Sequence, residues 1–185
     1  MNFNKHYELK NKHAFFSPSK HYWLRWDEEK IRNSYINAKA VEKGTRLHNL
    51  AAECISLGIK LKDNKTTLSM YVNDALSYKM TPEVALFYSD NCFGHTDAIS
   101  FKRNILRIFD LKTGEITTAS MEQLLIYAAL FCLEYHIDPK SIKYDLRIYQ
   151  FDKAICYEPN GDEIAEIIDI IVHHDMVVES MNMEE

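Results

Sequence analysis

The stretch FGHTDAISFKRNILRIFDLKTG, residues 93–114, decides the fold of this chain. It holds two runs, 93–102 and 105–113, that are rich in Ile and Phe and are separated by the turn-like pair Arg103-Asn104. A third run of the same kind, EVALFYSD at 83–90, comes before them. Short β-branched and aromatic runs divided by turn residues are typical of neighbouring strands. The three runs therefore predict an antiparallel meander.

Helical and strand patterns extend from this meander in both directions. Apolar residues at helical spacing precede it, and a long apolar helix, two strands and an acidic helix follow it. The expected helices are a short one with Ser19 as N-cap that carries Tyr22, Trp23 and Trp26, then 45–58 with Thr45 as cap and Gly58 as stop, 66–79, 119–137 and 162–181. The expected further strands are 143–151 and 153–159. This order predicts an α/β fold with a central mixed sheet flanked by helices.

Length and composition place limits on the class of protein. The chain has 185 residues, of which 46% are hydrophobic and 26% charged, so one globular domain spanning 1–185 is expected. No apolar stretch approaches the roughly 20 residues that cross a bilayer, and the polar first residues lack the apolar core of a secretory signal. A cytoplasmic protein is expected. The four widely spaced cysteines predict buried free thiols rather than a zinc site or an iron–sulfur cluster.

Charge is unevenly distributed along the chain. The net charge is −5, which argues against a general nucleic-acid binder. Residues 154–185 hold nine acids and no Lys or Arg, so the rest of the chain carries 22 bases against 18 acids. Several of those bases lie near the start, between Lys20 and Arg46, where a polyanion could find a positive surface.

An acid two residues before a lysine occurs five times, and the triplet alone is not informative. The five are Glu8-Leu9-Lys10, Glu28-Glu29-Lys30, Asp63-Asn64-Lys65, Asp110-Leu111-Lys112 and Asp138-Pro139-Lys140. Four of them lie in polar or turn segments, where solvated charge explains them. Asp110 and Lys112 instead follow a predicted buried strand and should project from the same face.

A second acid, Asp97, lies on the preceding predicted strand, and a meander would bring it beside Asp110. Two converging carboxylates repel each other unless a cation lies between them. Magnesium fits this pair, with waters and the Leu111 carbonyl completing its shell. Lys112 would then orient or help deprotonate a water that attacks a phosphodiester. The competing interpretation is a structural hairpin with an Asp97–Lys112 salt bridge, and the triad does not decide between them.

Two further features favour the catalytic interpretation. Gln123 and Tyr127 are spaced i, i+4 in the helix after the meander, so both can reach the strand ends. His48 lies at the edge of the apolar stripe of its helix, about 100° from Leu47. Taken singly, each is more often structural.

In this order, His48, Asp97, Asp110-Leu111-Lys112 and Gln123-x-x-x-Tyr127 resemble the PD-(D/E)XK nuclease superfamily. The similarity is to its RecB-like branch, which includes lambda exonuclease relatives and CRISPR-associated exonucleases. That branch has an upstream helical His, then G-x-x-D, then (D/E)-x-K, then Q-x-x-x-Y. The segments HAFFSPSKHYWLRW and EKGTRLHNLAAE also look like the opening of a phage and prophage family of poorly defined role, so the resemblance covers roughly residues 13–150.

The resemblance implies a restriction-endonuclease-like core and a role for each matched residue. Asp97 and Asp110 would be metal ligands for Mg²⁺ or Mn²⁺, with His48 as a further ligand or positioning group and Lys112 as the catalytic lysine. Gln123 and Tyr127 would shape the active site and the DNA path. Glu83 and Glu53 are weaker candidates, for which ordinary surface charge is the favoured interpretation. Relatives with an iron–sulfur cluster have a late cysteine group that this chain lacks, so no cluster is expected.

The expected function is a metal-dependent DNA nuclease, an exonuclease acting on DNA ends or single strands in phage-type recombination, repair or degradation. A recombination partner protein and a homo-oligomer are compatible with this function, and the cytoplasm of a bacterial host is the expected location. One alternative is a catalytically inactive nucleic-acid-binding protein that keeps the nuclease scaffold. Another is a protein-interaction accessory factor whose acidic C-terminal helix mimics DNA.

Overall fold

The structure is a computed structural model that describes residues 7, 14–114 and 120–182. The chain forms two compact units, Met1–Lys43 and Gly44–Glu185, here called the N-terminal unit and the sheet unit. The boundary between them falls inside one helix. Each unit is described by itself, and a single domain over 1–185 stays a prediction.

The N-terminal unit contains a 3₁₀ helix, η2 (Pro18–Arg25), and the first part of α1 (Glu28–Leu57). The prediction of Ser19 as N-cap is wrong, because the helix begins at Pro18 and Ser17, two residues earlier, occupies the cap position. Pro18 explains this start, since its fixed φ favours the first position of a helix and it needs no hydrogen-bond partner for a backbone N–H.

Helix α1 is longer than the sequence pattern indicated. Its end was predicted correctly: Gly58 adopts a left-handed φ of 70°, and Ile59 donates its N–H to the Cys54 carbonyl at 2.8 Å. The predicted start of α1 was wrong, because Thr45 lies inside the helix rather than capping it. Asp27 provides the cap instead, accepting the Lys30 N–H at 2.7 Å. Residues 28–44 do carry Ile31, Tyr35, Ala38 and Val41 at helical spacing, a pattern that the prediction did not use.

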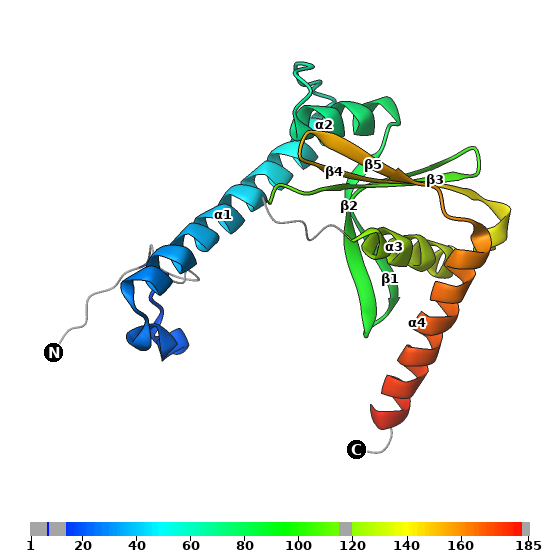
Figure 1. The fold of residues 1–185 in the computed structure, drawn as a ribbon. Coiled ribbons are helices and arrows are strands. Elements are labelled where there is room, and N and C mark those ends of the chain that lie inside the picture. The colour runs from blue at the N-terminus through cyan, green and yellow to red at the C-terminus, as the bar shows by residue number, and fades with distance from the viewer. Residues whose placement is uncertain (1–6, 8–13, 115–119, 183–185) are drawn as a thin grey trace. The chain divides into compact units, whose positions relative to one another are not determined.

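The sheet has five strands in the order β1-β2-β3-β4-β5 (Figure 1). Strands β1 to β3 are antiparallel neighbours, β3 and β4 are parallel, and β4 and β5 are antiparallel. The predicted meander and mixed sheet are thus confirmed. The bounds are Thr81–Ser89, Cys92–Lys102, Ile105–Leu111, Lys143–Gln150 and Lys153–Tyr157.

Helices cover both faces of the sheet. Helix α2 (Thr67–Ser77) lies on one face, and α3 (Met121–Glu134) lies on the other, with α4 (Gly161–Asn182) packed beside α3 (Figure 1). The parallel pairing of β3 and β4 is possible because the chain between them includes α3, and a parallel crossover needs a connection of this length.

Central strand β3 divides its side chains between two hydrophobic cores. Ile108 packs in the core formed with α3 and α4, whereas Phe109 and Leu111 pack in the core formed with α1 and α2. Because side chains alternate along a strand, Asp110 belongs to the α3 side together with Ile108. It is the acid at the carboxyl end of the most buried strand, and only 4% of it is exposed.

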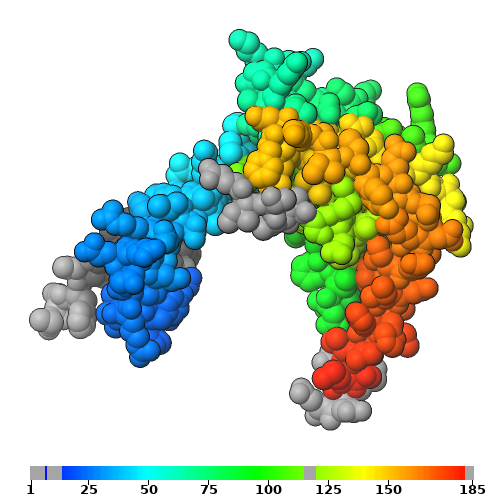
Figure 2. All heavy atoms as spheres, in the orientation of Figure 1, coloured from blue at the N-terminus to red at the C-terminus, as the bar shows by residue number. Residues whose placement is uncertain are grey.

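The C-terminal helix α4 presents most of its acidic and apolar residues to solvent beyond its first turns (orange to red in Figure 2). None of the helices among the described residues is both long and apolar enough to span a membrane. All four cysteines are free, and burial was predicted correctly for Cys54 and Cys132, while Cys92 is half-buried and Cys156 is exposed. Cys156 lies on edge strand β5, where one face is open to water.

Candidate active site

The two acids predicted to converge lie where β2 and β3 separate. The antiparallel ladder ends with Ala98 opposite Phe109, so Asp97 and Asp110 are the first residues beyond it. The Asp97 side chain replaces the next ladder contact, and its Oδ2 accepts the Leu111 N–H at 2.8 Å. This hydrogen bond fixes Asp97 against the end of β3, next to Asp110.

Lys112 connects the strand end to helix α3. Its backbone N–H bonds to the Tyr149 carbonyl at 2.9 Å, which holds it against β4 one residue past the end of β3. Its Nζ lies 3.0 Å from both Oδ1 and Oδ2 of Asp110 and donates to Gln123 Oε1, also at 3.0 Å. Gln123 Nε2 in turn donates to Tyr127 Oη at 3.4 Å. Four of the predicted site residues thus form one continuous polar chain.

Gly94 explains how Tyr127 reaches this position. A Cβ added at Gly94 would lie 2.8 Å from Tyr127 Cε1, closer than carbon atoms approach without strain. The ring therefore lies directly on the backbone of β2. The glycine of the G-x-x-D element and the tyrosine of the Q-x-x-x-Y element, separate in sequence, meet here through one packing contact.

His48 approaches the same strand ends from α1. Its Nδ1 lies 3.4 Å from Asp97 Oδ1. Helix α1 comes close because a Cβ on Gly44 would lie only 2.9 Å from Thr113 Oγ1, so a side chain there would push the helix away. The structure thus brings His48 to the carboxylate that also binds Leu111, and all the predicted side chains gather around the end of β3.

The charges at this site shift the proton affinities of its members. Burial raises the pKa of Asp110, and the neighbouring Asp97 carboxylate raises it further, against the opposing effect of Lys112. The hydrogen bond to Asp97 raises the pKa of His48. Burial, with the charges of Asp97 and Asp110, also raises the pKa of Tyr71, a buried α2 residue that the sequence reasoning missed. Each shift disfavours additional negative charge, so the site attracts cations.

The residues present fit a hard divalent cation, although they do not form a closed cage. Among the described residues, no three His, Cys, Asp or Glu side chains come together closely enough to hold a metal by themselves. Asp110 Oδ2 is buried and has the ion-pair contact with Lys112 Nζ at 3.0 Å, but it accepts no hydrogen bond from the part of the chain that is described. Magnesium commonly takes one or two carboxylates and keeps several waters, so Asp97, Asp110, the Leu111 carbonyl and His48 are a suitable donor set.

The partner of Lys112 differs from that of the competing structural interpretation. Lys112 pairs with Asp110 and not with Asp97, so the structural hairpin interpretation is wrong in its choice of partner.

Glu53 and Glu83 are both exposed, as surface charge predicts. Glu83, however, has a left-handed φ of 53° and contributes to raising the pKa of His48, which places its charge near the site. A positive φ at a residue other than glycine cannot be recognised from the sequence.

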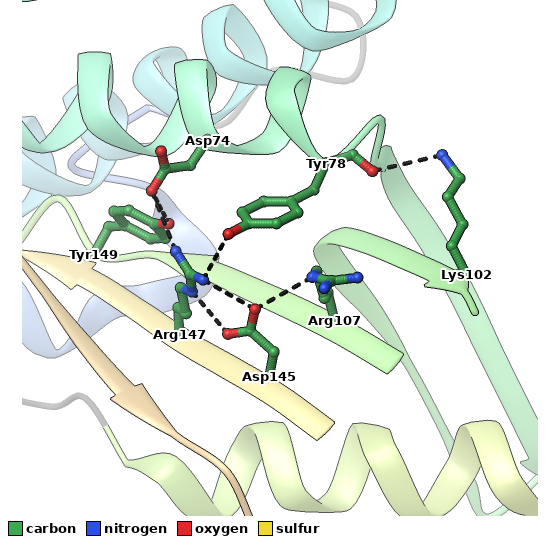
Figure 3. A network of polar contacts seen from close by, with 7 residues as sticks. All are labelled: Asp74, Tyr78, Lys102, Arg107, Asp145, Arg147 and Tyr149. Carbon is green, nitrogen blue, oxygen red and sulfur yellow. Dashed lines mark hydrogen bonds and ion pairs between the residues drawn. The ribbon is translucent and has the colours of Figure 1, made fainter. Parts of the chain in front are cut away.

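The opposite face of the sheet carries a second charged cluster that the sequence reasoning did not predict (Figure 3). Arg147 on β4 donates to both oxygens of Asp145, at 2.7 and 2.9 Å, and to Tyr78 Oη at 3.1 Å. Its guanidinium lies over the rings of Tyr78 and Phe109. Tyr149 Oη donates to Asp74 at 2.7 Å. This network joins β4 to α2, and we call it the Arg147 network.

The Arg147 network borders a basic pocket at the turn between β2 and β3. Arg107 lies over the Tyr78 ring at 4.5 Å, with its Nε 3.2 Å from Asp145 Oδ2, and Lys102 donates to the Tyr78 carbonyl at 3.5 Å (Figure 3). Lys102 also donates to the Lys79 carbonyl at 3.0 Å. The pocket has a volume of about 390 Å³, and no acid is among its described lining residues, which are Ser77, Tyr78, Lys79, Lys102, Arg103, Ile105 and Arg107. The sheet unit therefore has a local positive surface despite its acidic composition.

Comparison with known proteins does not add to this geometry. No family model matches the chain, and no curated protein matches its sequence. The function must therefore be argued from the site itself.

Proposed function

We propose that this chain is a metal-dependent DNA nuclease of the RecB-like PD-(D/E)XK type. The observation that carries the proposal is the polar chain Asp110–Lys112–Gln123–Tyr127, with Asp97 adjacent to Asp110 where β2 and β3 separate. Structural roles explain any one of these residues. They do not explain why a lysine, an amide, a buried carboxylate and a half-buried carboxylate should meet at one strand end, because poorly matched charge away from water costs stability.

The topology supports the same proposal. The expected core has a central mixed sheet flanked by helices, and strands β1 to β3 form an antiparallel meander with β4 parallel to β3. The acid-x-lysine triplet lies at the carboxyl end of β3, and the Gln-x-x-x-Tyr helix follows it.

Mg²⁺ or Mn²⁺, held by Asp97 and Asp110 with the Leu111 carbonyl and His48, would stabilise negative charge that develops on a phosphodiester. The protein itself positions the lysine: Asp110 and Gln123 hold the Lys112 ammonium from two sides. Held in this way, Lys112 can orient a water or take part in its deprotonation. His48 keeps Asp97 oriented, and Tyr127 keeps Gln123 turned toward Lys112.

A cleavage assay tests the proposal. The purified protein would be incubated with linear, nicked and circular DNA in Mg²⁺, Mn²⁺ or EDTA, beside Lys112→Ala. We expect hydrolysis by the wild type that requires metal and is lost in the variant. If neither protein cleaves any substrate with either metal, the enzyme proposal is wrong.

The chain offers a matched control for the lysine. Lys140 closes another acid-x-lysine triplet, Asp138-Pro139-Lys140, but its side chain is 60% exposed and pairs with Asp162 on α4. Lys140→Ala removes the same side chain from the same local sequence pattern outside the site. We expect it to retain full cleavage activity. Equal loss in Lys140→Ala and Lys112→Ala would mean that a general charge effect, and not the site, explains the result.

One observation favours the accessory alternative as a second candidate. Helix α4 is acidic and also exposes apolar side chains, a combination that suits a protein partner better than DNA. These exposed apolar residues are Ile170, Met176, Val177, Val178 and Met181. If the wild type cleaves no DNA and the Lys112→Ala variant still binds a protein partner stably, the accessory function is favoured.

A further inference from the structure

The N-terminal unit gathers aromatic rings between η2 and α1. Phe15 contacts Phe16, Trp26 and Tyr35 edge-on, with ring centroids 4.8, 6.1 and 5.4 Å apart. Trp23 also packs against Phe16, at 5.2 Å. Trp23 Nε1 donates to the Ser17 carbonyl at 2.9 Å, which fixes the indole on the 3₁₀ helix. The rings therefore have defined positions.

These rings do not form a closed core. No residue of η2 is buried, and Tyr22, Tyr35 and Phe16 are 54%, 49% and 42% exposed. Rings that served only to hold two helices together would be covered on both faces, because burial is what makes an aromatic cluster stabilising. Here the faces and edges of several rings stay accessible to a ligand.

The exposed ring surface lines a pocket with a volume of about 550 Å³. This volume is in the range of ligand sites and is sufficient for flat aromatic groups such as nucleobases. Its described lining residues are Ala14, Phe15, Ser17, Lys20, Tyr22, Trp26, Ser34, Tyr35, Ala38, Lys39 and Glu42. Two of these are lysines, and Lys39 Nζ lies 5.8 Å from the centroid of the Tyr35 ring while pairing with Glu42.

The charge of the two units indicates what kind of ligand would bind there. Residues 1–43 contain nine Lys or Arg against five acids, whereas residues 44–185 contain 13 against 22. A polyanion is therefore attracted to the N-terminal unit and repelled by much of the remaining surface. Aromatic platforms beside basic residues are the usual means of binding a single strand, because bases stack on rings while cations follow the phosphates.

We propose that the aromatic pocket of the N-terminal unit binds single-stranded nucleic acid by base stacking. Duplex DNA does not expose the faces of its bases, so it cannot use these rings without unpairing. The inference deepens the proposed function, on which its biological role rests, by naming a single strand as the form in which DNA is captured. The binding itself does not depend on cleavage.

Intrinsic fluorescence tests the proposal directly, because Trp23 and Trp26 are the only tryptophans in the chain. Titration of the full chain with a short oligo(dT) strand in EDTA, which prevents metal-dependent cleavage, should quench or shift the emission. The effect should weaken with added salt, since phosphate contacts release counterions. A blunt duplex of equal length should change the emission much less. Equal responses to single strand and duplex, or no response to either, would overturn the proposal.

Two variants test the residues involved. Tyr35→Leu keeps an apolar side chain beside Phe15 but removes the stacking surface, and we expect about 5- to 150-fold weaker single-strand binding. Lys20→Gln should weaken binding less and lower its salt dependence. Phe93→Leu is the matched control, because Phe93 is also exposed and stacks on Phe87 at 6.3 Å, but in the sheet unit. If Phe93→Leu weakens binding as much as Tyr35→Leu does, the proposed location is wrong.

The two proposals can fail separately. Single-strand binding in EDTA without cleavage under any metal condition would contradict the nuclease and leave the aromatic site intact. Cleavage by the wild type, with no fluorescence response and no effect of Tyr35→Leu on binding, would support the nuclease and contradict the aromatic site. A fluorescence response to a proline-rich peptide but to no oligonucleotide would show that the rings bind protein and would overturn the inference.

Discussion

The two charged clusters on opposite faces of the sheet differ in the hydrogen bonds that their carboxylates accept. In the Arg147 network, each Asp145 oxygen accepts a hydrogen bond from one guanidinium, and Asp74 accepts one from Tyr149. In the candidate active site, Asp110 and Asp97 are adjacent acids, and Asp110 Oδ2 accepts no hydrogen bond from the described residues. Both clusters are largely buried, so exposure does not explain the difference.

The comparison shows how a structural cluster can be told from a functional one. Buried charges stabilise a fold only when each is matched, because desolvation is otherwise uncompensated. In the Arg147 network each Asp145 oxygen accepts a hydrogen bond from Arg147, which joins β4 to α2, and only the neighbouring Arg107 Nε, 3.2 Å from Asp145 Oδ2, has no hydrogen bond among the described residues. In the site, Lys112 pairs with Asp110, but a second acid lies beside it, and burial together with this neighbouring acid raises the pKa of Asp110. A protein tolerates this cost where a ligand, here a divalent cation, can relieve it.

The largest expected effect separates the two clusters by activity. Lys112→Ala should lower metal-dependent DNA hydrolysis by roughly 10²- to 10⁴-fold, the usual contribution of a positioned proton-transfer group. Arg107→Lys, which keeps a positive charge beside Asp145, should change hydrolysis little. Initial rates with excess linear DNA in Mg²⁺ measure both. Comparable losses in the two variants would remove the functional distinction between the clusters.

The next largest effect separates the two clusters by their contribution to the free energy of unfolding. Arg147→Ala leaves Asp145 without its main partner in a half-buried position and should lower the free energy of unfolding by about 3–5 kcal/mol. Urea denaturation followed by circular dichroism measures it. The double variant Arg147→Leu/Asp145→Leu should recover part of the loss, since it removes the unmatched carboxylate, while Arg107 loses its ion pair with Asp145. A fully additive double variant would mean that the two residues are not coupled.

A smaller effect of the opposite sign is expected for Asp110→Asn in EDTA. The amide keeps the shape of the side chain while removing the repulsion by Asp97, so we expect a gain of about 1 kcal/mol in unfolding free energy at neutral pH. A carboxyl with a raised pKa costs the native state stability once pH exceeds its ordinary pKa of about 3.9. The gain should therefore disappear as pH falls toward 4. Wild type that is as stable as Asp110→Asn at neutral pH would show that Lys112 fully compensates the repulsion.

The smallest effect concerns His48. Its raised pKa means that the proton it holds stabilises the native state, fully below the ordinary pKa of about 6.5 and progressively less as pH rises through the raised value. The difference in unfolding free energy between wild type and His48→Gln in EDTA should shrink by about 0.2–1 kcal/mol above that range. His95→Gln is the control, because His95 is exposed on β2. Parallel pH profiles for all three proteins would contradict the His48–Asp97 contact.

Sequence reasoning predicted features that depend on local chemistry. The meander followed from β-branched runs and turn residues, and Arg103 and Asn104 do adopt the left-handed φ values of a tight hairpin turn. It failed for residues 28–44, because the helical spacing of Ile31, Tyr35, Ala38 and Val41 was not taken into account. The Arg147 network was missed for a different reason: Asp74, Tyr78 and Arg147 are ordinary residues whose pairing depends on how α2 crosses the sheet.

The sequence by itself determined the α/β class, the strands of the meander and the six side chains proposed for the site, because these depend on residue type and spacing. Only the tertiary structure decided which groups pair. In the tertiary structure Lys112 pairs with Asp110 and Gln123 rather than with Asp97, Tyr127 packs on Gly94, and Asp110 Oδ2 has an ion-pair contact with Lys112 but no hydrogen bond among the described residues. Such pairings depend on where two strands separate and how closely a helix approaches them, and these distances are set by packing across the whole sheet unit.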